Sequence, residues 1–303
     1  MRPLVDGDIP QAALLLHEGF PALSVAFWVA ALARLRHYGG NAQADVPLGW
    51  FMLHKDQPVG VMLTPASLRT RTDGSVEKLV NLSSWYVRPP HRWRAGFMLR
   101  GVMADKTCIY TDLTPTAEVQ LMLPKLGFTA LNRGVLLYAL PLLAVLPAGG
   151  AVVRALEPGE MWLHAGPAPE MIEAHRDLGC LPLVLETAAG PQLVVVKRIR
   201  VRGVPGAQLI YAASRSEVVR HRSALARHLL RRGLLIFVHD TPHARSTALG
   251  WFRQRDLWFA SGDDGSLSDR TDAFASELSI VHGQAAAVPL AAAGTAKQAG
   301  GMC

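Results

Sequence analysis

The chain has 303 residues, half of them apolar, and carries a formal net charge of +7 at pH 7. This length suits one large domain or two ordinary ones, and the apolar content is ample for packed cores. The three cysteines, Cys108, Cys180 and Cys303, are too widely spaced for a zinc motif or a disulfide framework. We therefore expect a reduced, cytoplasmic setting, and the start of the chain has no pattern typical of a secretory signal.

Apolar periodicity predicts alternating helices and strands in the first half of the chain. Asp8 and Pro10 are typical of a helix start, and Gly39 and Gly40 of a helix end. The predicted helices span 8–20, 25–37, 95–103 and 116–126, and the predicted strands span 50–65 (a hairpin), 79–87, 107–111 and 136–140.

Residues 135–153 form an uncharged stretch close to the length that spans a bilayer. Pro141, Pro147, Gly149 and Gly150 interrupt it, so a strand followed by a linker is favoured over a membrane span.

The second half repeats the later part of this order. The predicted helices span 169–177, 216–232 and 243–254, and the predicted strands span 181–185, 192–201, 208–212, 234–238 and 256–260. The last twenty residues, rich in alanine and glycine, are expected to be disordered. We therefore predict a first domain at 1–146, a linker at 147–160, a second domain at 161–283 and a tail at 284–303.

One pattern occurs twice and connects these two halves. Residues 80–115 and 208–242 each combine an apolar strand, a short basic bend, an amphipathic helix, a second strand and a Thr-Pro turn. Three identities, each separated by 127 positions, align the copies: Ile109 with Ile236, Thr114 with Thr241, and Pro115 with Pro242. Such self-similarity predicts two related structural halves. A bend that leads into a helix also directs main-chain N–H groups at one point, which suits a phosphate-bearing ligand.

The first copy resembles the GNAT superfamily of acyl-CoA-dependent N-acyltransferases. Three stretches carry the resemblance: 87–99 (VRPPHRWRAGFML), 110–115 (YTDLTP) and 124–128 (PKLGF). It implies an α+β fold of two GNAT-like halves, each a mixed, largely antiparallel sheet flanked by helices, with a degenerate second half. It also implies that acetyl-CoA or another acyl-CoA is the donor and a small amine or amino-acid-like molecule the acceptor.

The resemblance assigns the donor's pyrophosphate to a Q/R-x-x-G-x-G/A loop at a helix start. Arg92 occupies the first position of this motif, and Ala95 and Phe97 occupy the positions of small residues. Phe97 would crowd a pyrophosphate, unless a shift by one residue places Gly96 there. The residues expected to bind the cofactor are Val87, Arg88, Arg92, Arg94, Ala95, Gly96 and Phe97. Ordinary solvated arginines are the alternative interpretation of the three basic residues.

The resemblance also implies a tyrosine that protonates the leaving thiolate, and this chain has Leu123 at that position. Catalysis still requires an acid near the sulfur and a way to deprotonate the amine. Tyr110, Tyr86 and Asp112 are the nearby candidates for these catalytic roles. A turn or helix cap is the structural alternative for Asp112. His239, Asp240 and His243 lack the spacing of a metal site, so no metal is expected.

A basic stretch, residues 197–232, holds ten lysines and arginines against the single acid Glu217. It favours an anionic partner, although a solvated helix face with a guarded strand edge would give the same composition. Two alternatives to the acyltransferase hypothesis stay open. The departures from the family pattern at Phe97 and Leu123 leave a non-catalytic GNAT-like binding or regulatory protein. The basic stretch leaves a transferase that uses nucleic-acid-borne substrates such as aminoacyl-tRNA, with salt-sensitive RNA binding.

Overall fold

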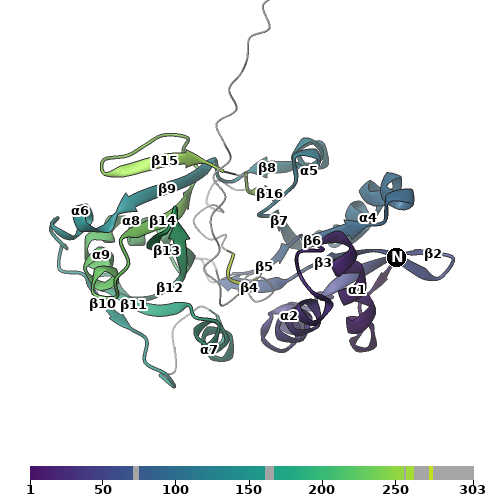
Figure 1. Cartoon of the computed structure of the whole chain (residues 1–303), viewed down its shortest axis with the longest axis horizontal. Coiled ribbons are helices and arrows are strands. Elements are labelled where there is room, and N and C mark those ends of the chain that lie inside the picture. The colour runs from purple at the N-terminus through teal and green to yellow at the C-terminus, as the bar shows by residue number, and fades with distance from the viewer. Residues whose placement is uncertain (71–74, 161–166, 256, 263–272, 276–303) are drawn as a thin grey trace, which may run out of the picture.

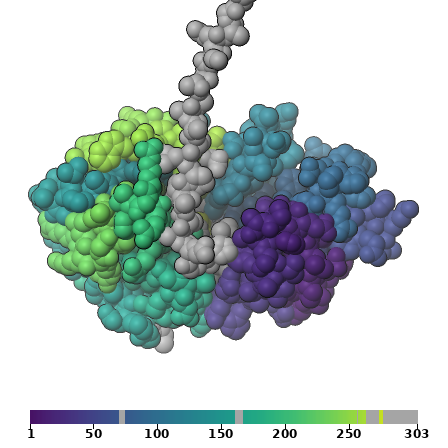
Figure 2. All heavy atoms as spheres, viewed as in Figure 1, coloured from purple at the N-terminus to yellow at the C-terminus, as the bar shows by residue number. Residues whose placement is uncertain are grey.

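A computed structural model describes the chain except for residues 71–74, 161–166, 256, 263–272 and 276–303. The described residues form two lobes, each built of β-sheet with helices packed against it (Figure 1). In the space-filling view the early residues, purple to blue, lie on one side, and the later residues, mostly green, lie on the other (Figure 2).

The first lobe has two sheets, with strand orders β1-β2-β3-β6 and β4-β5-β7-β16-β8. Its strands are β1 (Arg2–Pro3), β2 (Gly49–His54), β3 (Gln57–Leu63), β4 (Ala66–Thr70), β5 (Val76–Asn81), β6 (Ser83–Val87), β7 (Cys108–Asp112), β8 (Phe128–Ala130) and β16 (Phe259–Ser261). Its helices are α1 (Ile9–Gly19), α2 (Val25–Tyr38), α3 (Asn41–Ala44), α4 (Ala95–Val102) and α5 (Ala117–Met122), with 3₁₀ turns η1 (Asp6–Asp8), η2 (Pro89–Arg94) and η3 (Leu123–Leu126).

The second lobe has one seven-stranded sheet, with strand order β10-β11-β12-β13-β14-β9-β15. Its strands are β9 (Gly134–Ala139), β10 (Val152–Ala155), β11 (Leu181–Thr187), β12 (Gly190–Val201), β13 (Val204–Ala212), β14 (Ile236–Thr241) and β15 (Gly250–Gln254). Its helices are α6 (Leu140–Ala144), α7 (Pro169–Asp177), α8 (Arg215–Arg220) and α9 (Arg222–Leu230).

The predicted fold class is confirmed, because both lobes combine helices with mixed sheets that are mostly antiparallel. Each lobe has one parallel strand pair, β5 with β7 in the first and β13 with β14 in the second. These are the two strands that the repeat aligns in each half, so the repeated pattern corresponds to the same β-α-β unit in both lobes.

The lobes exchange their last strands. β9 follows the first lobe in sequence but lies between β14 and β15 of the second sheet, where Leu136 is paired with His239. β16 follows the second lobe in sequence but lies between β7 and β8 of the first, where Phe259 is paired with Asp112. The exchange fixes the lobes to each other through main-chain hydrogen bonds. The domain limits proposed from sequence stay a prediction. Each lobe contains one strand whose residues fall within the limits proposed for the other.

A shared core also joins the lobes. Leu16 of α1 and Leu32 of α2 belong to one buried cluster with Ile172 of α7 and Val195 of β12. Phe274, near the end of the described chain, is fully buried in the same cluster and stacks on His175 with ring centroids 3.7 Å apart. The apolar area buried here makes the contact between the lobes part of the hydrophobic core.

Three predictions about individual elements are wrong, and the stretch proposed as a linker contains a strand. The strand predicted at 79–87 is two strands, because the chain leaves its first sheet at Leu82. The helix predicted at 216–232 is interrupted at His221, between α8 and α9. Residues 250–254, predicted as helix, form β15, because β9 offers an edge where Gly250 pairs with Tyr138. The predicted linker contains β10, which pairs with β11.

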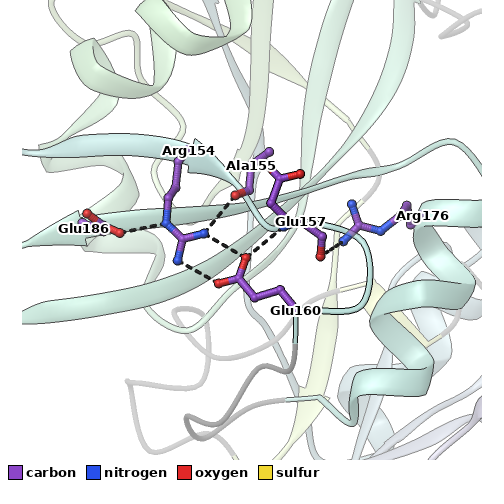
Figure 3. A network of polar contacts seen from close by, with 6 residues as sticks. All are labelled: Arg154, Ala155, Glu157, Glu160, Arg176 and Glu186. Carbon is purple, nitrogen blue, oxygen red and sulfur yellow. Dashed lines mark hydrogen bonds and ion pairs between the residues drawn. The ribbon is translucent and has the colours of Figure 1, made fainter.

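Arg154 of β10 organises a polar network on the outer edge of the second lobe (Figure 3). Its guanidinium donates to both carboxylate oxygens of Glu160, each at 2.9 Å, and to Glu186 at 2.9 Å. These contacts hold the pKa of Glu160 below its usual value. The network ties the strand to the turn that follows it.

No helix in the described part of the chain is long and apolar enough to cross a bilayer.

Candidate functional site

The first lobe opens where β6 separates from β7. β5 pairs with β7 in parallel up to Asn81 and Thr111, and the Leu82 N–H still donates to the Thr111 carbonyl oxygen. The next strand, β6, pairs instead with β3, where Val87 lies opposite Gly60. β6 is the terminal strand of its sheet, so its edge on the β7 side is an edge without a strand partner among the described residues.

A β-bulge produces this separation. Val61 pairs with Tyr86 and Leu63 with Ser83, so Ser84 and Trp85 face the single residue Met62. Ser84 has a φ of 45°, in the left-handed region that non-glycine residues seldom occupy. Bulges bend a strand and end its pairing, and they are common beside binding sites. A linear group could therefore hydrogen-bond to the open edge of β6 as a further strand would.

The turn after β6 holds the three predicted phosphate-binding arginines. Arg88 donates to Glu18 through Nε at 2.9 Å and through Nη2 at 2.6 Å. Arg92 Nε donates to the Val87 carbonyl oxygen at 3.3 Å, and Arg94 Nη1 donates to the Leu53 carbonyl oxygen at 3.1 Å. Arg92 and Arg94 thus face main-chain oxygens beside the turn, whereas a carboxylate holds Arg88.

The small-residue positions of the motif lie in the first turn of α4. A Cβ atom on Gly96 would meet nothing within 4 Å, so the space beside it is open. The side chain of Phe97 is 65% exposed and belongs to none of the buried clusters of the described residues. The Phe97 side chain therefore points outward from α4, and the expected crowding of a pyrophosphate stays a prediction.

Asp112 ends β7 next to the opening. Its side chain is only 8% exposed, and burial raises its pKa to about 7 although the Thr114 N–H donates to Oδ1 at 3.2 Å. Asp112 therefore makes the turn contact that was the structural alternative for this residue. The perturbed pKa also makes this carboxyl group suited to exchange protons near neutral pH.

The two tyrosine candidates lie in different places. The Tyr110 hydroxyl donates to the Val102 carbonyl oxygen at 3.0 Å below α4, and burial raises its pKa well above the ordinary value. Tyr86 lies on β6, packs against the α1–α2 core and sits so close to Gly19 that a Cβ there would lie 2.5 Å from its ring. Leu123, at the position of the family's tyrosine, is fully buried in the α4 core.

Sequence analysis did not identify Trp85 as a polar participant. Its indole Nε1 is buried and has no hydrogen-bond partner among the described residues. This indole is therefore an unsatisfied buried donor at the bulge. The chain gives little signal for this feature, because a bulge depends on the register with β3 rather than on Trp85 itself.

A cavity of about 210 Å³ lies elsewhere, under the end of α4. Trp50, Val80, Cys108 and Tyr110 contribute to its walls. Because Val80 pairs with Tyr110 before the strands separate, this cavity is not the opening beside β6.

The second lobe repeats the separation at equivalent positions. β13 pairs with β14 up to Gln208 and Val238, which are 127 positions after Asn81 and Thr111. A register shift against β12 then leaves Ile210 as the extra residue. Both lobes therefore contain the same arrangement of bulged strand, helical turn and helix.

Three solved structures match the chain over both lobes. A GCN5-related N-acetyltransferase from Anabaena variabilis ATCC 29413 matches with a TM-score of 0.55 and 11% identity, over 86% of this chain and 71% of that chain. A protein of unknown function from Enterococcus faecalis V583 matches with a TM-score of 0.57 and 8% identity, over the same two shares. A GCN5-related N-acetyltransferase from Kribbella flavida matches with a TM-score of 0.51 and 14% identity, over 85% and 69%.

The chain has the GNAT fold. No protein-family model and no curated protein matches it. At these identities the likeness concerns the fold, so the chemistry of the site depends on the residues themselves.

The basic stretch at 197–232 does not form a single exposed face. Arg227 donates to the carbonyl oxygens of Ala144 and Leu146, and Arg222 donates to that of Val219. Arg215 is buried. Part of this charge therefore serves contacts within the lobe. No group of three metal-ligating side chains occurs in the described part of the chain.

Proposed function

We propose that the protein is an acyl-CoA-dependent N-acyltransferase that acylates a small amine-bearing acceptor at the opening beside β6. The observation that carries the proposal is the bulged separation of β6 from β7, directly followed by a basic turn and the start of α4. The open strand edge and the buried indole donor lie on β6, and the positive charge lies in the turn that follows it.

The residues present fit a linear, phosphate-bearing donor. Hydrogen-bonding groups alternate between the two edges of a strand. The Arg88 N–H bonds to Val59 on β3, so the neighbouring Val87 N–H is directed to the open edge. Val87 and the Trp85 indole would hold amide or carbonyl groups, while Arg92 and Arg94 would neutralise phosphates. When bound, an acyl-CoA would supply the thioester carbon that the amine attacks.

Asp112 is the group that we assign to proton removal from the acceptor. With a pKa of about 7, a substantial fraction of the carboxyl group is ionised at neutral pH. A base with a pKa near the working pH is effective in general base catalysis. The amine nitrogen forms the bond to the acyl carbon, the carbon–sulfur bond breaks, and the amine proton passes to Asp112 directly or through water.

Tyr86 is the better candidate to protonate the leaving thiolate. The Tyr110 hydroxyl is engaged by Val102, whereas the Tyr86 hydroxyl makes no hydrogen bond among the described residues. Gly19 fixes the position of Tyr86 by permitting the close packing of its ring. Gly19→Ala therefore serves as a positioning variant that moves the ring and keeps the hydroxyl.

The deciding experiment combines calorimetric binding of CoA and acetyl-CoA with a thiol-release assay over a panel of amines. We expect binding in the wild type that Arg92→Glu weakens, since the substitution reverses a charge beside the phosphates. Asp112→Asn should keep CoA affinity and lower kcat by roughly 100-fold or more. Arg133→Glu, on a residue outside the opening, is the charge-matched control for Arg92→Glu.

Acceptor-dependent thiol release that Asp112→Asn leaves intact would exclude the assigned base. CoA binding without thiol release from any donor–acceptor pair would instead favour the non-catalytic interpretation. Absence of CoA binding would contradict the proposal as a whole.

A further inference from the structure

The cavity under the end of α4 is separate from the proposed acyl-transfer site. The basic turn precedes α4, whereas the cavity lies at the other end of this helix, between the loop after α3 and the strands β2, β5 and β7. Its volume is about 210 Å³. An engineered apolar cavity of about 150 Å³ in another protein holds benzene. The cavity of this chain is therefore large enough for a ligand group of ring size.

The walls of the cavity are mainly apolar. Val46, Val80 and Val102 contribute aliphatic surface, and Trp50 and Tyr110 contribute aromatic rings. Val80, Val102 and Tyr110 are buried in the core under α4, so that core holds them in place. A ligand that fits these walls needs an apolar body.

The hydroxyl and thiol protons of the walls are already used within the protein. The Thr64 and Tyr110 hydroxyls donate to main-chain carbonyl oxygens, at 2.6 Å and 3.0 Å. The Cys108 thiol donates to Oδ2 of Asp105 at 3.3 Å. A ligand therefore meets hydroxyl and carboxylate oxygens that can accept hydrogen bonds, and it needs a donor of its own to use them.

The charged groups that line the cavity are carboxylates. Asp45 and Asp105 are both exposed at its rim, and none of the described lysines and arginines lines it. Hydrogen bonds from Thr107 and, to a smaller extent, the charge of Lys78 hold the pKa of Asp105 below its ordinary value. Asp45 forms no ion pair within the described part of the chain. Negative charge beside aromatic and aliphatic walls favours a ligand with a cationic end.

We propose that this cavity is a second ligand-binding site, for a small primary amine that carries an apolar body of ring size. The apolar body packs against Trp50 and Val80, and the ammonium group stays at the rim beside Asp45 and Asp105. The ammonium group keeps part of its hydration at the rim, so the burial of the apolar body is not offset by the desolvation of a charge. This inference goes beyond the proposed acyl transfer and does not depend on it.

The ligand class is tested by calorimetry with four probes. 2-Phenylethylamine carries both features, 2-phenylethanol lacks the charge, ethylamine lacks the ring, and 3-phenylpropionate reverses the charge. Wild type should bind 2-phenylethylamine about tenfold or more tightly than each of the other three. Failure of 2-phenylethylamine to bind, or equal affinity for any of the other three, overturns the proposal. Equal affinity for ethylamine would show that the acidic rim alone attracts the amine.

The role of the rim is tested by Asp45→Asn. Asp45 has a φ of 53°, in the left-handed region that asparagine also tolerates, so the substitution removes the charge and keeps the backbone. It should weaken the binding of 2-phenylethylamine by about threefold and leave that of 2-phenylethanol unchanged. Asp56→Asn is the matched control, because Asp56 is also exposed, has a φ of 60° and lies outside the cavity. Equal losses of affinity in the two variants contradict the proposed rim contact.

The location is tested by Ala104→Phe. Ala104 is exposed and lines the cavity, so the added ring covers the entrance without displacing a core residue. The variant should bind 2-phenylethylamine at least tenfold more weakly, by the loss of the apolar contact. Ala117→Phe, on an exposed residue of α5 outside the cavity, is the control and should bind like the wild type. Ala104→Leu is the smaller substitution if Ala104→Phe fails to fold.

Unchanged affinity for the amine in both Ala104 variants places the ligand elsewhere and overturns the site. CoA affinity is measured in the same variants and should equal that of the wild type. A chain that binds no CoA, but binds 2-phenylethylamine in a way that Ala104→Phe prevents, contradicts the proposed acyl transfer and leaves the amine site intact.

Discussion

Arg88 and Arg215 occupy equivalent positions in the two lobes, Arg88 directly after β6 and Arg215 at the start of α8 shortly after β13, yet their surroundings differ. The Arg88 side chain is 39% exposed and donates two hydrogen bonds to Glu18. The Arg215 side chain is 8% exposed, and two of its nitrogens have no partner among the described residues. A repeated backbone thus fixes where an arginine stands, while burial and neighbouring acids determine whether it is available to a ligand.

The same contrast holds at the ends of the equivalent strands β7 and β14, where Asp112 corresponds to His239. Burial raises the pKa of Asp112 to about 7 and lowers the pKa of His239 to about 4. Both environments favour the neutral form of the side chain. One position thereby obtains a carboxyl group that titrates near neutrality, and the other obtains an imidazole that stays uncharged there.

The largest effect should come from the aromatic residues of these strands. Phe237, equivalent to Tyr110, is almost fully buried under α9. Phe237→Ala should lower the free energy of unfolding by about 3–5 kcal/mol because it leaves a cavity. Tyr110→Phe keeps the ring but leaves the Val102 carbonyl oxygen without its donor, at a cost of about 1–2 kcal/mol. Urea unfolding measures both, and equal losses would show that the two positions are not packed as the structure indicates.

The pH dependence of stability should differ in sign between Asp112 and His239. The native state holds the Asp112 proton up to about pH 7, while the unfolded chain releases it near 3.8, so stability falls as pH rises through this window. The native state keeps His239 neutral down to about pH 4, while the unfolded chain protonates it near 6.5, so stability falls as pH drops through that window. The effect is on the order of 4 kcal/mol for Asp112 and 3 kcal/mol for His239.

Because the windows overlap, the two effects oppose each other in the wild type. As pH rises from 4 to 6.5, the free energy of unfolding should increase more steeply in Asp112→Asn than in the wild type. In His239→Phe it should decrease relative to the wild type over the same range. His175, whose pKa burial also lowers to about 4, is present in both variants and cancels in the comparison. Thermal unfolding as a function of pH measures these slopes, and parallel profiles for the two variants would contradict the assignment.

Much of the fold was predictable because local patterns define it. Helices α1 and α2, the β2–β3 hairpin and the repeated β-α-β unit all follow from periodicity and turn residues. The exchange of β9 and β16 was not predictable, because a strand's sequence does not specify which sheet edge it joins. For the same reason β15 was mistaken for a helix.

The site was predicted only in part. The basic turn and Asp112 were identified from their place in the repeat, and the structure locates both at the opening. The unpaired buried donors of Trp85 and Arg215 were not predicted, since they result from tertiary packing. The outward position of Phe97 was not predicted, because it depends on how the start of α4 is oriented on the lobe.

A smaller effect is expected from Arg88→Gln. The Arg88–Glu18 pair is about two-fifths exposed on both sides, so its loss should cost at most about 1 kcal/mol. CoA affinity should fall less than in Arg92→Glu, because Glu18 already holds the Arg88 guanidinium. Glu18→Gln releases Arg88 and should strengthen CoA binding slightly. A loss of affinity in Arg88→Gln as large as in Arg92→Glu would show that the donor displaces Glu18.

The smallest effect is expected at the Arg154 network, the second lobe's counterpart of an exposed arginine pair (Figure 3). Arg154→Gln removes contacts to two carboxylates, but its side chain is 43% exposed, and solvent screens all three charges. Arg154 holds the pKa of Glu160 below its ordinary value. Any stability that this pair contributes is therefore present above the ordinary glutamate pKa and is lost as pH falls below it. Thermal unfolding should therefore show that Arg154→Gln is slightly less stable than the wild type at pH 7 and equally stable at pH 3. A loss at pH 7 larger than that of Arg88→Gln would mean that the network, unlike the isolated Arg88–Glu18 pair, acts cooperatively to hold β10 on the sheet.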